Sequence, residues 1–235
     1  MKKIVISTLV VSSLLLASDA NKFVTHTELG YIQTSGNTDT KTFNLDAKAK
    51  KAFDLHSLSL TLDAQYAKDT NVETKNKFAT ELGYSYKFSD KLSFGYLAGY
   101  KKDKFSNYDY QFYTGPSIGY KLIESDSHNL NAEGSILMSK DDIRNSNQTE
   151  EYVAYRAKGV YEWKILENLK FDQEVGYRGS FEDSQNYFVD SKSALTSKLT
   201  DMFSAGISYK IDYVNLSGPK EHTDKTFTAN LIIDY

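Results

Sequence analysis

The sequence predicts an all-β fold, namely a transmembrane antiparallel up-and-down β-barrel of about twelve strands. The last eleven residues, Lys225 to Tyr235 (KTFTANLIIDY), alternate between apolar and polar side chains and end on an aromatic ring. This pattern is typical of the closing strand of a bacterial outer-membrane barrel. Similar alternating segments recur along the chain, and aromatic residues gather near the ends of those segments.

The N-terminus predicts export from the cytoplasm. Met1–Lys3 is a short positive region, and Ile4–Leu16 is an apolar run too short to span a bilayer. Small residues follow, so we expect a signal peptide in residues 1–20 that is cut after Ala20, and a barrel in residues 21–235. A cut two or three residues earlier and a helical membrane anchor are the alternatives.

The composition excludes several classes of site. The chain has 235 residues, no Cys and only two Pro, with 18 Tyr and 13 Phe. Disulfides, thiolate metal sites and thiol nucleophiles are therefore excluded, and little interrupts the strands. A net charge of −3 argues against a nucleic-acid binder. The mean hydropathy of −0.51 suits a barrel, because only every second residue of a barrel strand meets lipid.

Alternation over about nine residues or more predicts the strands in chain order. They are Phe23–Gln33, Thr42–Phe53, Ser57–Tyr66, Lys77–Phe88, Leu92–Lys101, Tyr108–Tyr120, Asn129–Ser139, Tyr152–Trp163, Leu169–Ser180, Phe188–Leu199, Phe203–Val214 and Thr226–Tyr235. In the third strand, Leu58, Leu60 and Leu62 are assigned to the outward face. The intervening Ser59 and Thr61 are assigned to the lumen.

Two aromatic girdles distinguish a membrane barrel from a water-soluble β-sandwich, which is the alternative fold. The group beside the short turns is Phe53, Phe88, Tyr120, Trp163, Phe171, Phe203 and Tyr235. The group near the other ends is Tyr31, Tyr66, Phe78, Tyr100, Tyr110, Tyr177, Tyr213 and Phe227.

The connections alternate in length. Short turns are expected at Asp54–His56, Ser89–Lys91, Ile165–Asn168 and Thr200–Asp201, with a somewhat longer one at Lys121–His128. Longer loops are expected at Thr34–Lys41, Lys68–Asn76, Lys102–Asn107, Lys140–Glu151, Phe181–Tyr187 and Asn215–Lys225. Short periplasmic turns and long outer loops are usual, so both termini are expected in the periplasm.

The segment from Glu28 to Thr40 reads ELGYIQTSGNTDT. It resembles the opening motif of the YdiY-like family, described as salt-induced outer-membrane proteins, and the segment that begins at Thr223 is similar to the end of that family. The resemblance implies an outer-membrane barrel and supplies no catalytic residue. The loop motif itself is Thr34, Ser35, Gly36, Asn37 and Thr38, in which Gly and Asn tolerate positive φ. A tight turn is the favoured interpretation, and a ligand site is the alternative.

The sequence gives no catalytic, cofactor or metal site. Among the four His, His26 is assigned to the lumen, His56 and His128 to periplasmic turns, and only His222 to an outer loop. A hydrolase is therefore a distant alternative. The acidic residues Asp141, Asp142, Glu150 and Glu151 match no cation-binding pattern and are interpreted as solvated loop charges.

Charged residues of both signs are assigned to the lumen. The candidate lining residues are Lys48, Asp63, Glu81, Glu133, Arg156, Lys158, Glu162, Lys170, Asp172, Glu174, Arg178 and Lys192. The expected turns pair Lys48 with Asp63, Glu162 with Lys170, and Lys158 with Glu174. Small inward residues, Gly83, Gly95, Gly99, Gly115 and Gly119, are expected to leave space on one side of the lumen.

The expected function is a narrow, weakly selective channel for ions or small solutes, or a stress-responsive envelope protein. The alternative is a non-conducting barrel whose lumen is closed by its own charges. We expect a monomer in the outer membrane, reached through the periplasm, whose partners are lipid and the barrel assembly machinery. Phe227, Leu231, Ile233 and Tyr235 are expected to form the C-terminal insertion signal.

Overall fold

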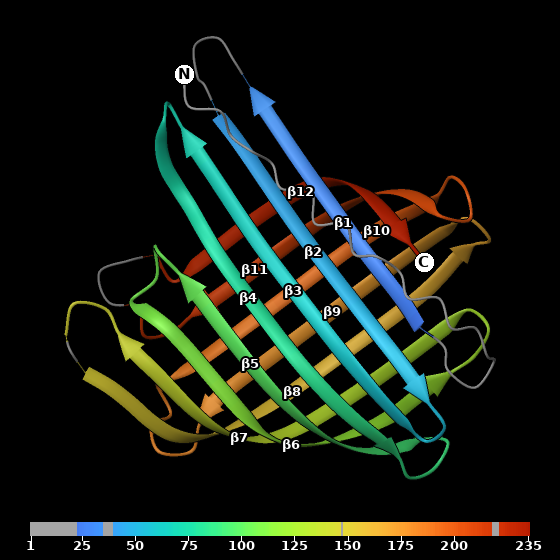
Figure 1. The fold of residues 1–235 in the computed structure, drawn as a ribbon, viewed down its shortest axis with the longest axis horizontal. Helices are drawn as coiled ribbons and strands as arrows, with labels where there is room; N and C mark the ends of the chain where they lie inside the picture. Colours follow the sequence, from blue (N-terminus) through green and yellow to red (C-terminus); the bar gives the residue numbers. More distant parts are fainter. Residues whose placement is uncertain (1–22, 35–39, 147, 218–220) are drawn as a thin grey trace.

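The computed structural model describes residues 23–34, 40–146, 148–217 and 221–235, and these residues form a closed antiparallel barrel (Figure 1). Each strand pairs with its neighbours in sequence, and β1 pairs with β12 to close the wall. The strands are β1 Phe23–Thr34, β2 Thr40–Phe53, β3 His56–Asp69, β4 Val72–Lys87, β5 Leu92–Asp103, β6 Tyr108–Glu124, β7 His128–Ile143, β8 Gln148–Leu166, β9 Leu169–Ser180, β10 Tyr187–Lys198, β11 Phe203–Val214 and β12 Thr223–Asp234. The predicted fold class and the twelve strands are confirmed. Over the described ranges, no helix is long and apolar enough to cross a bilayer.

The outer wall is apolar because the strand period of two sends alternate side chains outward. Leu58, Leu82 and Ile136 expose 50%, 59% and 58% of their surface. Such exposure of large apolar side chains suits a surface that faces lipid.

One end of the outer wall carries a continuous aromatic run. Tyr155, Tyr177, Tyr187 and Tyr213 come from the neighbouring strands β8 to β11, and His222 follows on the loop before β12. Successive rings are stacked with centroids 5.7 to 5.9 Å apart. Amphipathic rings at this level mark a membrane–water interface.

Aromatic contacts also gather at the opposite end, beside the short turns. Phe88 packs edge-on against Phe94 at 5.6 Å, and His128 stacks on Trp163 at 5.8 Å. The two girdles together bound the lipid-facing band.

Several strands extend beyond the predicted ends. β3 and β4 continue to Asp69 and Val72, joined by the two-residue turn Thr70–Asn71, in which φ is 47° and 65°. The predicted long loop at Lys68–Asn76 is therefore wrong. Positive φ at both central residues is the hairpin geometry that matches strand twist, so pairing continues up to this turn.

The seam between β1 and β12 is short. Register pairs run only from His26, opposite Asp234, to Gly30, opposite Asn230. Two backbone hydrogen bonds between Thr25 and Tyr235, of 2.6 and 3.0 Å, extend it at the end of the barrel that carries the short turns.

Apolar residues fill the lumen beside β5 to β8. Leu97, Leu137, Tyr152 and Ala154 are buried together, with Tyr113 packed against them. This cluster differs from the expectation that the inward faces are polar and that these strands are lined by small residues.

The prediction that the inward glycines leave free space in the lumen is also wrong at Gly99 and Gly83. The Tyr113 ring occupies the place that a Cβ on Gly99 would take, and the Ser59 hydroxyl lies 2.6 Å from the place of a Cβ on Gly83. These glycines permit close cross-strand approach, and they do not leave an open path.

Candidate functional site in the barrel lumen

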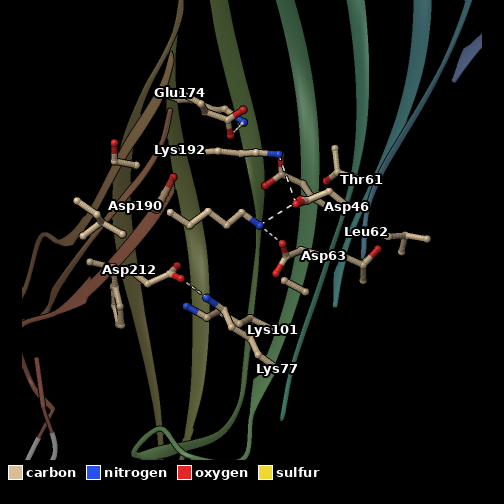
Figure 2. A pocket seen from close by; sticks show the side chains of 18 of the residues that line it. Asp46, Thr61, Leu62, Asp63, Lys77, Lys101, Glu174, Asp190, Lys192 and Asp212 are labelled. Atoms are coloured by element: carbon tan, nitrogen blue, oxygen red, sulfur yellow. Dashed lines mark hydrogen bonds and ion pairs between the residues drawn. The ribbon is translucent and has the colours of Figure 1, made fainter. Parts of the chain in front are cut away.

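The centre of the lumen is crossed by an ion network. Lys192 on β10 contacts Glu28 on β1 at 2.6 Å and Asp46 on β2 at 3.4 Å. Lys210 on β11 contacts Asp46 at 3.1 Å and also pairs with Asp63 on β3. Figure 2 shows the Lys192 side chain reaching toward Asp46, so the network joins strands that are not neighbours in the wall.

The register explains why this network forms. Lys192 stands opposite Lys210 on adjacent strands, and Asp46 stands opposite Asp63. Like charges directly opposite one another are destabilising within a sheet. Closure of the barrel brings the two cations to the two carboxylates, and the repulsion within each wall is thereby offset.

A second ion pair lies nearer the end of the barrel opposite the chain's C-terminus, which we call the outer end. Lys77 on β4 pairs with Asp212 on β11, and Lys77 is only 6% exposed. Lys101 on β5 lies beside Lys77 in Figure 2, where both side chains extend toward Asp212.

Glu174 on β9 is shared by two lysines. Lys158 Nζ on β8 lies 2.6 Å from its carboxylate, and Lys48 Nζ on β2 lies 3.3 Å away. The predicted pairing of Lys158 with Glu174 is present as an ion pair, although it is diagonal, because Lys158 stands opposite Gly176.

The other two predicted charge pairs are wrong. Lys48 stands opposite Thr61 and not Asp63, because the turn is formed by Asp54, with φ of 51°, and Leu55. Its ion partner is instead Glu174. The β8–β9 register likewise differs from the predicted one and includes a bulge near Leu166. Glu162 therefore stands opposite Asp172, and Lys170 opposite Lys164.

Another ion pair joins β4 and β8 across the lumen. Arg156 Nη1 lies 2.7 Å from Glu81 Oε2, and the Tyr113 hydroxyl donates to the same oxygen at 2.8 Å. The Arg156 guanidinium lies 5.8 Å from the centre of the Tyr113 ring. Both charged side chains are mostly buried, at 13% and 22% exposure.

The remaining predicted lumen residues have these positions. Glu133 stands opposite Lys158, and Lys170 contacts Asp172 at 3.1 Å on the same strand. The Arg178 guanidinium lies 4.4 Å from the Phe188 ring centre and 4.9 Å from that of Tyr113.

The described residues line a middle and an outer cavity within the barrel. The middle cavity, of about 230 Å³, is lined by charges of both signs, including Asp46, Asp63 and Lys210. The outer cavity, of about 470 Å³, is lined by the ends of β5, β6, β11 and β12 and the loops between them. Both cavities share Lys77, Lys101 and Asp212 in their linings, so these three residues mark the junction.

The acidic residues at the outer end are not all solvated loop charges. Asp141 lies within β7 and is fully buried, with its carboxylate accepting hydrogen bonds from Gln111 at 3.0 Å and from the Tyr152 hydroxyl at 2.8 Å. That prediction is wrong for Asp141, because β7 and β8 continue through the expected loop. Across the described part of the chain, no group of three or more His, Asp or Glu is placed to hold a metal ion.

The histidines have structural contacts. His56 bonds to the Tyr84 hydroxyl at 2.7 Å, and His128 to the Tyr161 hydroxyl at 2.8 Å. His222 bonds to the Val214 carbonyl at 3.0 Å.

Two other predicted features are only partly visible. In the loop motif, Thr34 ends β1, whereas residues 35–38 lie outside the described residues, as does the predicted signal peptide. In the predicted insertion signal, Phe227, Leu231 and Tyr235 are 57%, 47% and 56% exposed, and Ile233 stands opposite Thr27 and Phe203.

Comparison with known sequences identifies relatives. The profile of a family described as "Protein of unknown function, DUF481" matches residues 27–235. The uncharacterized protein YdiY of Escherichia coli K12 is 23% identical over 221 residues, covering 92% of this chain and 84% of YdiY. The resemblance to the YdiY-like family is thereby confirmed.

Comparison with solved structures finds chains that align over most of their length. An outer membrane channel from Pseudomonas putida F1 aligns with a TM-score of 0.52 at 11% identity, covering 94% of this chain and 96% of the channel. The translocator domain of the autotransporter NalP from Neisseria meningitidis aligns with a TM-score of 0.49 at 10% identity, covering 93% and 89% of the two chains.

Proposed function

The chain belongs to the DUF481 family of proteins of unknown function, and we propose that it is a narrow, weakly selective channel for ions and small solutes in the bacterial outer membrane. One observation carries the proposal: the outer and middle cavities share Lys77, Lys101 and Asp212 in their linings. Space lined by charged side chains therefore extends from the outer end of the barrel to its middle, where it would form the outer part of a solute path. The structural similarity to an outer membrane channel is consistent with this proposal.

The ion network sets the expected selectivity. Cations and carboxylates both line the middle cavity, so neither sign of solute meets a wall made only of the opposite charge. A ring of one sign is what concentrates counter-ions strongly. Weak selectivity and a small conductance follow.

The proposal includes the biogenesis that the sequence predicts. The chain would be exported with cleavage of residues 1–20, inserted by the barrel assembly machinery and retained as a monomer in outer-membrane lipid. A response to salt, which the family resemblance implies, remains a prediction about expression and has no assigned residue.

A non-conducting barrel is the second candidate, and the cross-lumen ion pairs favour it. Lys48 with Glu174, Arg156 with Glu81, and Lys77 with Asp212 each join strands that are not neighbours. Conductance of the refolded barrel in planar bilayers separates the two candidates. Discrete channel openings support the first, and silence from correctly folded protein at both low and high salt supports the second.

A further inference from the structure

Lys101 differs from the other lysines at the centre of the lumen. Lys77, Lys192 and Lys210 each pair with a carboxylate. Lys101 makes no ion pair or side-chain hydrogen bond within the described ranges, although it lines both cavities at their junction. In Figure 2 it lies beside Lys77, which takes the Asp212 carboxylate.

Charges of both signs surround Lys101. Its strongest electrostatic neighbours are Lys77, Asp212, Arg178 and Asp103. With Lys101 itself, these are three cations and two carboxylates. Asp103 lies two residues further along β5, where its carboxylate accepts a hydrogen bond from the backbone of Phe105.

Arg178, another cation near Lys101, also has no carboxylate partner among the described residues. Its guanidinium is held between the rings of Phe188 and Tyr113, at 4.4 and 4.9 Å from their centres. Its buried Nη1 has no hydrogen-bond acceptor. A partly desolvated cation without a counter-charge favours the approach of an anion.

We propose that Lys101, with Lys77 beside it, binds a small oxyanion at the junction of the two cavities. Carboxylate and phosphate oxygens share the chemistry that this site needs, since both accept charge-assisted hydrogen bonds from an ammonium group. The middle cavity of about 230 Å³ restricts the ligand to small anions. In a conducting barrel, this site would be a point along the path at which anions are favoured. This consequence rests on the proposed channel function.

Binding at this site is expected to be weak and saturable. Asp103, Glu221 and Asp224 line the outer cavity and oppose the approach of an anion from that side. Asp190 lines the middle cavity but not the outer one, and it opposes the approach of an anion from the middle cavity. The site is therefore a local feature of Lys101 and does not make the whole lumen anion-selective.

The test compares Lys101→Met, which removes the charge at similar length, with Lys101→Arg, which keeps it. Lys102→Met is the matched control, because Lys102 is the next residue, is exposed and does not line either cavity. Folding of each variant is checked by heat-modified gel mobility. Reversal potentials in planar bilayers should show the anion-to-cation permeability ratio falling about threefold or more in Lys101→Met, and little change in Lys101→Arg or Lys102→Met.

Calorimetric titration of the refolded barrel with inorganic phosphate and with acetate provides a readout that needs no conduction. Wild type and Lys101→Arg should bind, with Lys101→Met losing binding, and the relative strength of the two probes identifies the preferred oxyanion. Equal titrations in wild type and Lys101→Met, or no binding by wild type, would overturn the site even if the barrel conducts. If the barrel does not conduct but binds phosphate in a way that depends on Lys101, the proposed channel function is overturned and the oxyanion site is retained.

Discussion

Replacing Arg156 with Met should destabilise the barrel strongly, because it leaves Glu81 in the lumen without its counter-charge. The two charged groups are 2.7 Å apart at their nearest atoms and only 13% and 22% exposed. At an effective dielectric constant of about 20, two unit charges about 4 Å apart attract by about 4 kcal/mol. Desolvation offsets part of this attraction, and removing one partner of a buried pair commonly costs about 3 kcal/mol or more. We therefore expect Arg156→Met to lower the free energy of unfolding by about 3 kcal/mol.

A double-mutant cycle isolates the pair from the packing of the arginine stem. Arg156→Met, Glu81→Gln and the double variant are unfolded by guanidinium in lipid vesicles, with Trp163 as the fluorescent probe, since it is the only Trp in the chain. The double variant should lose about 2 kcal/mol less than the sum of the single variants. If the destabilisation of the double variant equals the sum for the two single variants within about 0.5 kcal/mol, the reasoning is refuted. That result would mean that water in the lumen screens the two charges.

Three further predictions test the wall, the seam and the lumen. Leu60→Arg should cost about 2–4 kcal/mol of unfolding free energy and the adjacent inward Thr61→Arg much less, because only Leu60 faces lipid; equal costs measured in vesicles would contradict the assignment of faces. Deleting Tyr235 removes two backbone hydrogen bonds to β1 from the short seam, so less heat-modifiable barrel should be recovered from outer membranes; unchanged recovery would count against a role in insertion. Changing Lys158 and Lys170 to Glu should make a conducting barrel cation-selective by reversal potential, and an unchanged ratio would show that these residues do not line the path.

Much of the barrel wall is predictable from the sequence, because it depends on a local rule. Alternation along Ser57–Tyr66, for example, is enough to place Leu58 outward, and the structure agrees. The rule fails at strand ends. At Lys68 to Asn76 every side chain except Val72 is polar, so the alternation disappears while backbone pairing continues around the Thr70–Asn71 turn.

The site is less predictable, because its contacts depend on register and on closure of the barrel. Turn positions that differ from the expected ones move Lys48 away from Asp63. The ion pair between Lys48 and Glu174 joins strands far apart in the chain and has no local signature. The pattern does not predict that Lys101 faces the lumen, because Lys102 follows it directly. Two consecutive charged residues at the end of a strand do not show which of them points inward.

The central claim is that polar space within this barrel forms a path for ions. Single-channel recording of the refolded wild-type barrel in planar bilayers tests it most directly, with folding verified by heat-modified mobility. We predict small, discrete conductance steps with little preference for either sign of ion. No steps at either low or high salt, from protein shown to be folded and inserted, would contradict the claim and leave a barrel closed by its own ion pairs.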